Sequence, residues 1–127
     1  MGSDQKPRDT RALGRAGEDL ACEFLQRAGF RILARNVHLR YAELDVVALD
    51  GPTLVFVEVR LRRGARFGGA AESVDLRKQR RIVAAAAELL ASRRLPRMPR
   101  VRFDVVAIDA SCAPPRVSHH RDAFSAE

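Results

Sequence analysis

The stretch AELDVVALDGPTLVFVEVR, residues 42–60, constrains the fold more than any other part of the sequence. It holds two apolar runs, 43–49 and 54–61, separated by Asp50, Gly51, Pro52 and Thr53. Glycine and proline side by side favour a turn, so the two runs are predicted to form an antiparallel hairpin. Both runs are more apolar than a sheet with one solvated face requires, which indicates that helices cover the sheet.

Two amphipathic helices and two further strands are predicted around this hairpin. Apolar residues recur at helical spacing over residues 10–28 and 75–92, whereas strict alternation predicts strands at 30–37 and 101–109. The expected fold class is α/β, a mixed sheet flanked by helices in the order helix, strand, strand, strand, helix, strand. At 127 residues we expect one domain over 10–127 and a disordered tail at 1–9. The pattern after residue 115 is too short to decide between a strand and a helical turn.

Composition limits the location and the chemistry. No apolar run is long enough to span a membrane, and the start MGSDQKPRDT lacks the apolar centre of a signal peptide, so a cytoplasmic location is expected. Cys22 and Cys112 have neither the number nor the spacing of a disulfide framework or a zinc site. We expect both cysteines to be reduced and structural.

The formal net charge of +7 favours an anionic partner, nucleic acid above all. Only Lys6 and Lys78 are lysines, so a general bias toward arginine is the competing explanation of this charge. With no Trp and one Tyr, the chain is poorly supplied with stacking surfaces for single-stranded bases. Electrostatic contact with backbone phosphates fits the composition better.

Three acidic residues, Glu43, Asp45 and Glu58, lie inside the apolar hairpin strands. If the last residue of the first strand pairs with the first residue of the second, Asp45 stands opposite Glu58 and Glu43 opposite Arg60, whereas a bulge would separate them. Opposed carboxylates repel each other unless a cation lies between them. A Mg²⁺ or Mn²⁺ ion with these oxygen ligands would satisfy both charges and would suit hydrolysis of a phosphodiester.

Ordinary ion pairs are the competing explanation of the same residues. Glu43 would then pair with Arg60, Asp45 would meet another arginine, and Glu58 would be hydrogen-bonded at the end of the sheet. The spacing alone does not decide between the two.

Five segments together resemble a known family. In chain order they are GRAGEDLACEFLQRAGFRILARN, AELDVVALDG, VFVEVRLR, FGGAAESVDLRKQRRI and RFDVVAID, within residues 13–109. They resemble the YraN-like family of presumed nucleases, in the restriction-endonuclease-like superfamily with PD-(D/E)xK active sites, related to Holliday-junction resolvases. The resemblance implies a restriction-endonuclease-like core, a Mg²⁺ or Mn²⁺ cofactor and hydrolysis of DNA. Its link to the resolvases extends the expectation to branched DNA and to a homodimer.

The resemblance also implies roles for four residues. Glu18 is the acid of the first helix beside the site, Asp45 and Glu58 are metal ligands, and Arg60 occupies the position of the catalytic basic residue.

The sequence departs from the family pattern at two positions. Ala42 stands where the family usually has glycine, and Arg60 stands where it usually has lysine. Lysine can orient or deprotonate the attacking water, whereas arginine stays protonated and can only stabilise charge. Lys78 is the candidate substitute, provided that the second helix brings it near.

Basic residues after the hairpin are the candidate phosphate contacts, with an ordinary solvated surface as the alternative. They are Arg62, Arg63, Arg66, Lys78, Arg80 and Arg81. The leading hypothesis is a metal-dependent, endonuclease-like protein that acts on DNA. A noncatalytic nucleic-acid-binding module on the same fold is the alternative, and an interaction domain without nucleic acid is a third reading.

Overall fold

The computed structural model of the chain describes the backbone of residues 2–62 and 74–126, with side chains from residue 14 onward. The elements are α1 (Gly2–Arg27), β1 (Arg31–His38), β2 (Glu43–Asp50), β3 (Thr53–Arg62), α2 (Leu76–Ser92), β4 (Arg100–Asp109) and β5 (Arg116–Phe124). The strands form one sheet in the order β1-β2-β3-β4-β5. All neighbours are antiparallel except β3 and β4, which are parallel. A parallel pair needs a long crossover connection, and α2 lies within it.

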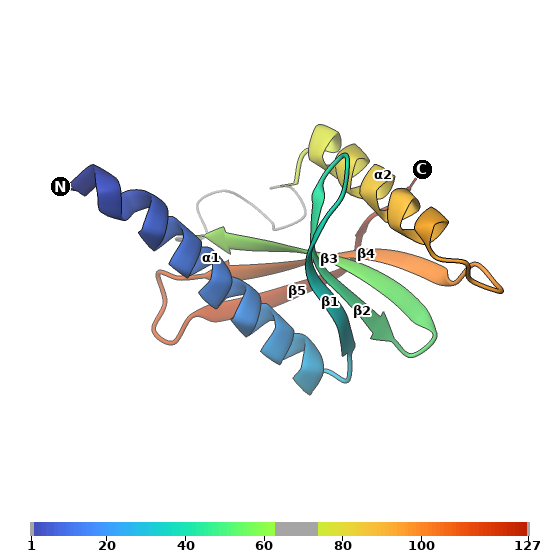
Figure 1. Cartoon of the computed structure of the whole chain (residues 1–127). Helices are drawn as coiled ribbons and strands as arrows, with labels where there is room; N and C mark the ends of the chain where they lie inside the picture. Colours follow the sequence, from blue (N-terminus) through green and yellow to red (C-terminus); the bar gives the residue numbers. More distant parts are fainter. Residues whose placement is uncertain (1, 63–73, 127) are drawn as a thin grey trace.

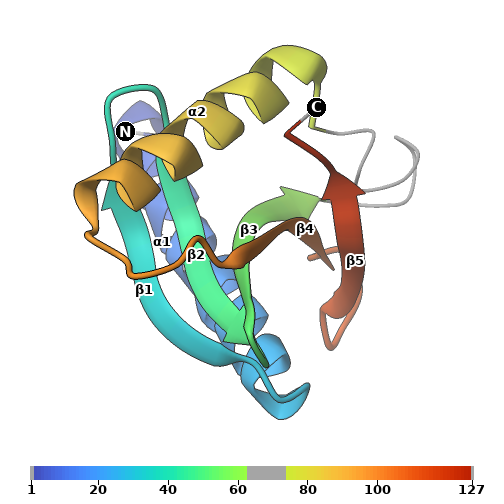
Figure 2. The same cartoon turned by 90° about the vertical axis from the view of Figure 1, so that its right-hand side faces the viewer.

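The two helices lie on opposite faces of the sheet (Figures 1 and 2). On the α1 side the buried cluster is Ala21, Cys22, Leu25, Phe30, Val46, Ala48, Val55, Val57, Val106 and Ile108. On the α2 side the rings of Phe56, Phe103 and Phe124 stack across β3, β4 and β5 beneath Ile82 and Ala86. Coverage of both faces explains why the hairpin strands are so apolar, and the α/β class predicted from the sequence is confirmed.

A glycine in the left-handed region stands at the predicted turn and another after the end of α1. Asp50 pairs with Thr53, so the connection between β2 and β3 is the two residues Gly51 and Pro52, and Gly51 has a φ of 58°. Gly29, with a φ of 95°, follows the end of α1, where a left-handed residue commonly stops a helix.

The start of α1 and the segment after residue 115 differ most from the sequence prediction. Helix α1 begins at Gly2 rather than near Thr10. That residues 1–9 form a disordered tail stays a prediction. The undecided segment after residue 115 forms β5, which adds a fifth strand beside β4.

The alternation of side chains slips in the middle of β2. Leu44 and Val47 are three residues apart and yet both pack in the cluster on the α2 side. Within the described ladder between β1 and β2, Asn36 and Asp45 are not paired, and Asn36 has a φ of 53°. A residue in the left-handed region shifts the pleat by one step, as at a β-bulge. The slip places Asp45 at an irregular point of the sheet.

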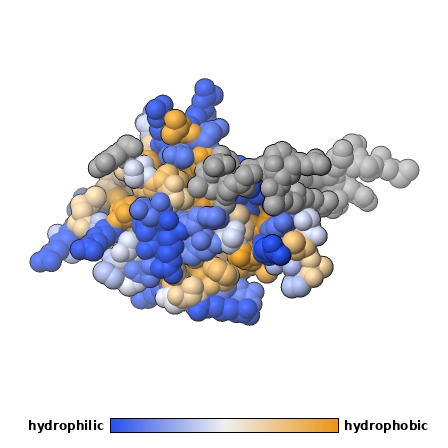
Figure 3. Space-filling model, turned by 180° about the vertical axis from the view of Figure 1, so that it is seen from behind, coloured by the Kyte–Doolittle hydropathy of each residue, from blue (hydrophilic) through white to orange (hydrophobic). Residues whose placement is uncertain are grey.

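The surface seen from behind is largely hydrophilic, with smaller hydrophobic areas between the polar side chains (Figure 3). Among the described residues, neither helix combines the length and the apolar character needed to cross a bilayer.

Candidate active site

The sheet opens between β2 and β3 at the centre of the molecule. The ladder of these strands runs from Asp50 and Thr53 as far as the pair Val46 and Val57. Beyond Val57, β3 continues to Arg62 and pairs with β4 but no longer with β2. This point of separation between β2 and β3, called the fork, lies beside Asp45, where the alternation of side chains in β2 slips.

Asp45 and Glu58 face each other across this fork. The carboxylate of Asp45 accepts the backbone N–H of Val59 at 2.9 Å, in the place where a strand carbonyl would accept it in a continued ladder. Glu58 is 6% exposed. Burial, together with the neighbouring charge of Asp45 and a hydrogen bond shared with it, raises the pKa of Glu58 to about 8. At neutral pH the carboxyl groups of Asp45 and Glu58 therefore share one proton.

Lys78 completes the cluster from α2. Its Nζ lies 3.9 Å from Oε1 of Glu58. The position of Lys78 follows from the helix cap, since Asp75 precedes the helix and its side chain accepts the Lys78 N–H at 2.8 Å. The sequence hypothesis that the second helix brings Lys78 to the acids thus agrees with the structure. The Asp75 cap was missed, although an aspartate just before a helical pattern is a recognisable signal.

Arg60 lies two residues after Glu58 on β3, on the same face by strand alternation. Both Lys78 and Arg60 lower the pKa of Glu58 electrostatically, and Lys78 has the larger effect. The lysine is therefore the stronger electrostatic partner of the buried acid.

Glu43 and Glu18 lie together in a different place. With Gly14, Arg15, Asn36 and His38 they line a hollow of about 310 Å³ between α1 and the first two strands. Glu18 also lies 3.7 Å from Arg35. Glu43 does not stand opposite Arg60 in the described ladder, which ends at Val46 and Val57, and it stands opposite His38 on β1.

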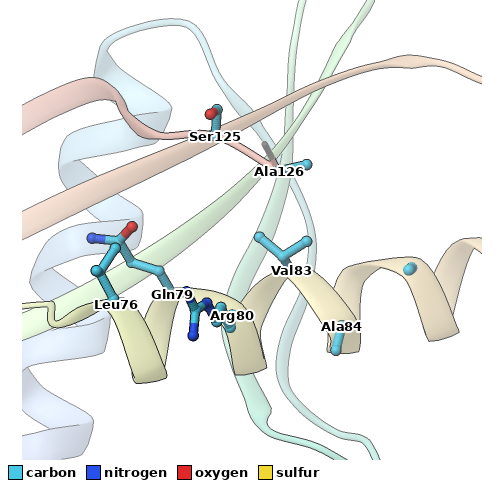
Figure 4. Close-up of a pocket in the computed structure, with 8 residues that line it drawn as sticks. Leu76, Gln79, Arg80, Val83, Ala84, Ser125 and Ala126 are labelled. Atoms are coloured by element: carbon cyan, nitrogen blue, oxygen red, sulfur yellow. The ribbon is translucent and has the colours of Figure 1, made fainter.

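The basic residues of α2 do not share one face. Arg81 follows Lys78 by three residues and lies on the same stripe of the helix. Arg80 is turned roughly 160° from Lys78 around the axis. It lines a hollow of about 330 Å³ with Leu76 and Ser125, between α2 and the end of the chain (Figure 4). Arg63 and Arg66 lie outside the described residues, and Arg62 is partly buried at the end of β3.

A second charged cluster, on the opposite face of the sheet from α2, is built from ion pairs. Asp104 is fully buried and accepts hydrogen bonds from Arg102, from the His119 ring at 2.8 Å and from the Asp122 N–H. Arg102 also bonds Asp50 at 2.9 Å. These contacts give Arg102 and Asp104 a structural role.

The donor set at the fork suits a hard divalent cation. Asp45 and Glu58 present carboxylate oxygens to each other, and a dication would replace the shared proton and relieve their repulsion. Within the described part of the chain, no group of three or more His, Cys, Asp or Glu residues is arranged to hold a metal. Asp45 and Glu58 are the residues of this cluster that could hold the ion, and Glu18 lies in the separate hollow.

The fold and this cluster define the class, an α/β protein with paired carboxylates and a lysine where its mixed sheet forks. The family described as "Uncharacterised protein family UPF0102" matches residues 17–108, and the chain belongs to this family. A UPF0102 protein of Rhodococcus opacus is 51% identical over 116 residues, covering 89% of this chain and 96% of the relative. One of Xanthomonas campestris pv. campestris is 53% identical over 112 residues, covering 87% and 89%. One of Pseudomonas aeruginosa is 46% identical over 120 residues, covering 92% and 95%. These matches confirm the resemblance to the YraN-like family, which is the same family.

Proposed function

We propose that this protein is a divalent-metal-dependent, endonuclease-like enzyme that hydrolyses phosphodiester bonds of DNA, branched DNA included, in the cytoplasm. One observation carries the proposal. Two carboxyl groups, one of them buried, are held together at a fork in the sheet with a lysine amine 3.9 Å from the buried one. A perturbed acid with a named charge partner is a mark of a functional site.

Each residue of the cluster has a distinct part in this proposal. Asp45 and Glu58 would hold Mg²⁺ or Mn²⁺, which when bound supplies charge stabilisation at the phosphate and activation of water. The Val59 N–H fixes the Asp45 carboxylate through their 2.9 Å hydrogen bond. Glu58 would give up its shared proton as a ligand of the ion. The ammonium group of Lys78 stands where it can orient the attacking water, and Arg60 stabilises the negative charge of the phosphate.

A noncatalytic nucleic-acid-binding module is the alternative, and Arg60 is the residue that favours it. A guanidinium in place of the family's lysine cannot act as a base. In this reading the basic surface binds DNA while the acidic pair has no turnover.

Cleavage separates the two readings. Labelled duplex, single-stranded and four-way-junction DNA are incubated with wild type, Asp45→Asn and Glu58→Gln in Mg²⁺ or Mn²⁺. We expect metal-dependent products from the wild type and a loss of about 100-fold or more with either substitution. Glu88→Gln, a change of the same type on α2, serves as the matched control and should cleave normally. Salt-sensitive binding without cleavage of any substrate would favour the noncatalytic module.

A further inference from the structure

A basic and apolar surface lies at the opposite end of α2 from Lys78. Residues 89–103 contain five arginines and no acidic residue. Arg93, Arg94, Arg97 and Arg100 are exposed, and within the described residues none of these four forms an ion pair with a carboxylate. The nearest acidic residue before them along the chain, Glu88, accepts the backbone N–H of Arg40 at 2.9 Å. These four arginines are called the arginine rim below.

An apolar groove adjoins the arginine rim. It has a volume of about 310 Å³ and is lined by Leu33, Ala34, Val37, Val47, Leu54, Leu89, Leu90, Arg93 and Leu95. Leu33 is 46% exposed and Leu95 is 45% exposed. Nearby in the chain, Met98 is 74% exposed. Large apolar side chains left open to water beside a groove mark an interaction surface.

The surface is separate from the candidate active site. Lys78 lies in the first turn of α2, near the fork, and Ser92 is the last residue of α2, near the arginine rim. The two residues are roughly 20 Å apart along the helix axis. Arg100 pairs with Thr53, at the start of β3, whereas Glu58 lies in its second half. The groove therefore does not serve the fork between β2 and β3.

The arginine rim and the apolar groove together indicate the chemistry of the partner. Phosphate backbones need positive charge but have no use for a groove lined by leucine and valine, whereas a peptide with carboxylates and large apolar side chains uses both. A second copy of this chain carries the same net charge of +7 and would bring like charge to the rim. The exposed edge of β1 is a poor template for an added strand, because its pairing shifts between Ile32 and Ala34 and Asn36 has a φ of 53°.

We propose that the groove and the arginine rim bind an acidic segment of another protein that carries large apolar side chains. Leucine or phenylalanine side chains enter the groove between β1 and the end of α2. Aspartate or glutamate side chains on either side of them pair with the arginines. Affinity then depends on both parts and falls as salt rises.

The test is a fluorescence-anisotropy titration with defined synthetic peptides. The probe is a fluorescein-labelled peptide of sequence DDLFDDLFDD. Two matched peptides remove one component each, DDAADDAADD the apolar side chains and NNLFNNLFNN the charge. We expect the first peptide to bind at least about tenfold more tightly than either of the others, because only it satisfies both parts of the surface.

Two variants locate the binding on the protein. Arg97→Glu should weaken binding of the probe by about tenfold or more, whereas Arg116→Glu, an equal charge change at the far end of β4 and β5, should leave it within about twofold. Leu33→Ser should weaken it through the groove, and thermal unfolding of each variant verifies that it folds.

Three results would overturn the proposal. One is equal binding of the probe and DDAADDAADD, which would mean unspecific charge attraction. Another is an equal effect of Arg97→Glu and Arg116→Glu. The third is a stronger loss of duplex DNA binding than of peptide binding in Arg97→Glu, which would make the rim a nucleic-acid contact.

Discussion

Lys78 on α2 meets Glu58 on β3, with 3.9 Å between Nζ and Oε1, although twenty residues of sequence separate them. The glutamate side chain is 6% exposed and the lysine side chain 39%. The buried acid thus has a positively charged partner on α2 that water reaches, at the point where the sheet opens. In the proposed enzyme this lysine takes over the part that the residue at position 60 usually has in the family.

Replacement of Lys78 tests that assignment. Lys78→Met should lower the rate of DNA cleavage by about 100-fold, because orientation of the water and stabilisation of charge are both lost. Arg77→Met removes a positive charge from the exposed surface of α2 beside Lys78 and is the matched control, with little effect on the rate expected. A variant Lys78→Met as active as Arg77→Met would exclude the lysine from the chemistry.

Arg60→Lys restores the residue usual in the family. Because Lys78 is already the stronger electrostatic partner of Glu58, we expect the cleavage rate of this variant to stay within about threefold of the wild type. Single-turnover cleavage of the best substrate measures the rate. An acceleration of tenfold or more would show that Arg60 limits the enzyme and that Lys78 does not replace the missing lysine.

The acidic pair makes the stability of the metal-free protein depend on pH. The pKa of Glu58 lies at about 8 in the folded chain against an ordinary 4.5, so the folded state holds a proton that the unfolded state has lost. Stability therefore falls as pH rises from about 4.5 to about 8. Glu58→Gln should abolish this fall and be more stable than the wild type at pH 9 by a few kcal/mol.

Urea unfolding in EDTA at pH 5, 7 and 9 measures this difference. Glu23→Gln, which changes an exposed glutamate on α1, should follow the wild type at all three values of pH. Parallel stability curves for Glu58→Gln and the wild type would mean that Glu58 ionises normally beside Asp45.

The buried network at Asp104 predicts the opposite dependence of stability on pH. Burial alone would raise the pKa of Asp104, but the hydrogen bonds from His119, Arg102 and Asp122 lower it to about 2. Its contribution to stability is present above the ordinary pKa and is lost as pH falls toward 2. Asp104→Asn should cost about 3 kcal/mol at pH 7, and this cost should shrink in acid.

Urea unfolding at pH 7 and pH 3 gives the two values for Asp104→Asn. Asp19→Asn alters an aspartate that is 68% exposed and bonded to Arg35, and it should cost less than about 1 kcal/mol. A cost for Asp104→Asn that is equally small at pH 7 would contradict the structural role of the network.

Local sequence signals predicted the hairpin and the position of Asp45 next to Glu58. The turn at Gly51 and Pro52 sets the register, and the register leads Asp45 toward Glu58. The stop at Gly29 and the apolar spacing of both helices are equally local. For that reason the fold class and the carboxylate pair could be predicted from residues alone.

Other parts depend on contacts that no local pattern contains. Glu43 lies away from Asp45 and Glu58 because the alternation of side chains slips near Asn36. No sequence pattern requires a left-handed residue at Asn36. The reach of Lys78 to Glu58 depends on how α2 crosses the sheet. Strand β5 was undecided because its side chains are mostly exposed or half-buried and it has a second left-handed residue, Asp122.

The most direct test of the metal site is calorimetric titration of the protein with Mn²⁺ at pH 7 in two buffers of different ionisation enthalpy. The account predicts binding by the wild type with release of about one proton, since the ion displaces the proton shared by Asp45 and Glu58. Asp45→Asn and Glu58→Gln should each weaken binding by tenfold or more, whereas Glu43→Gln should not. Binding that survives both substitutions, or no binding by the wild type, would contradict the site.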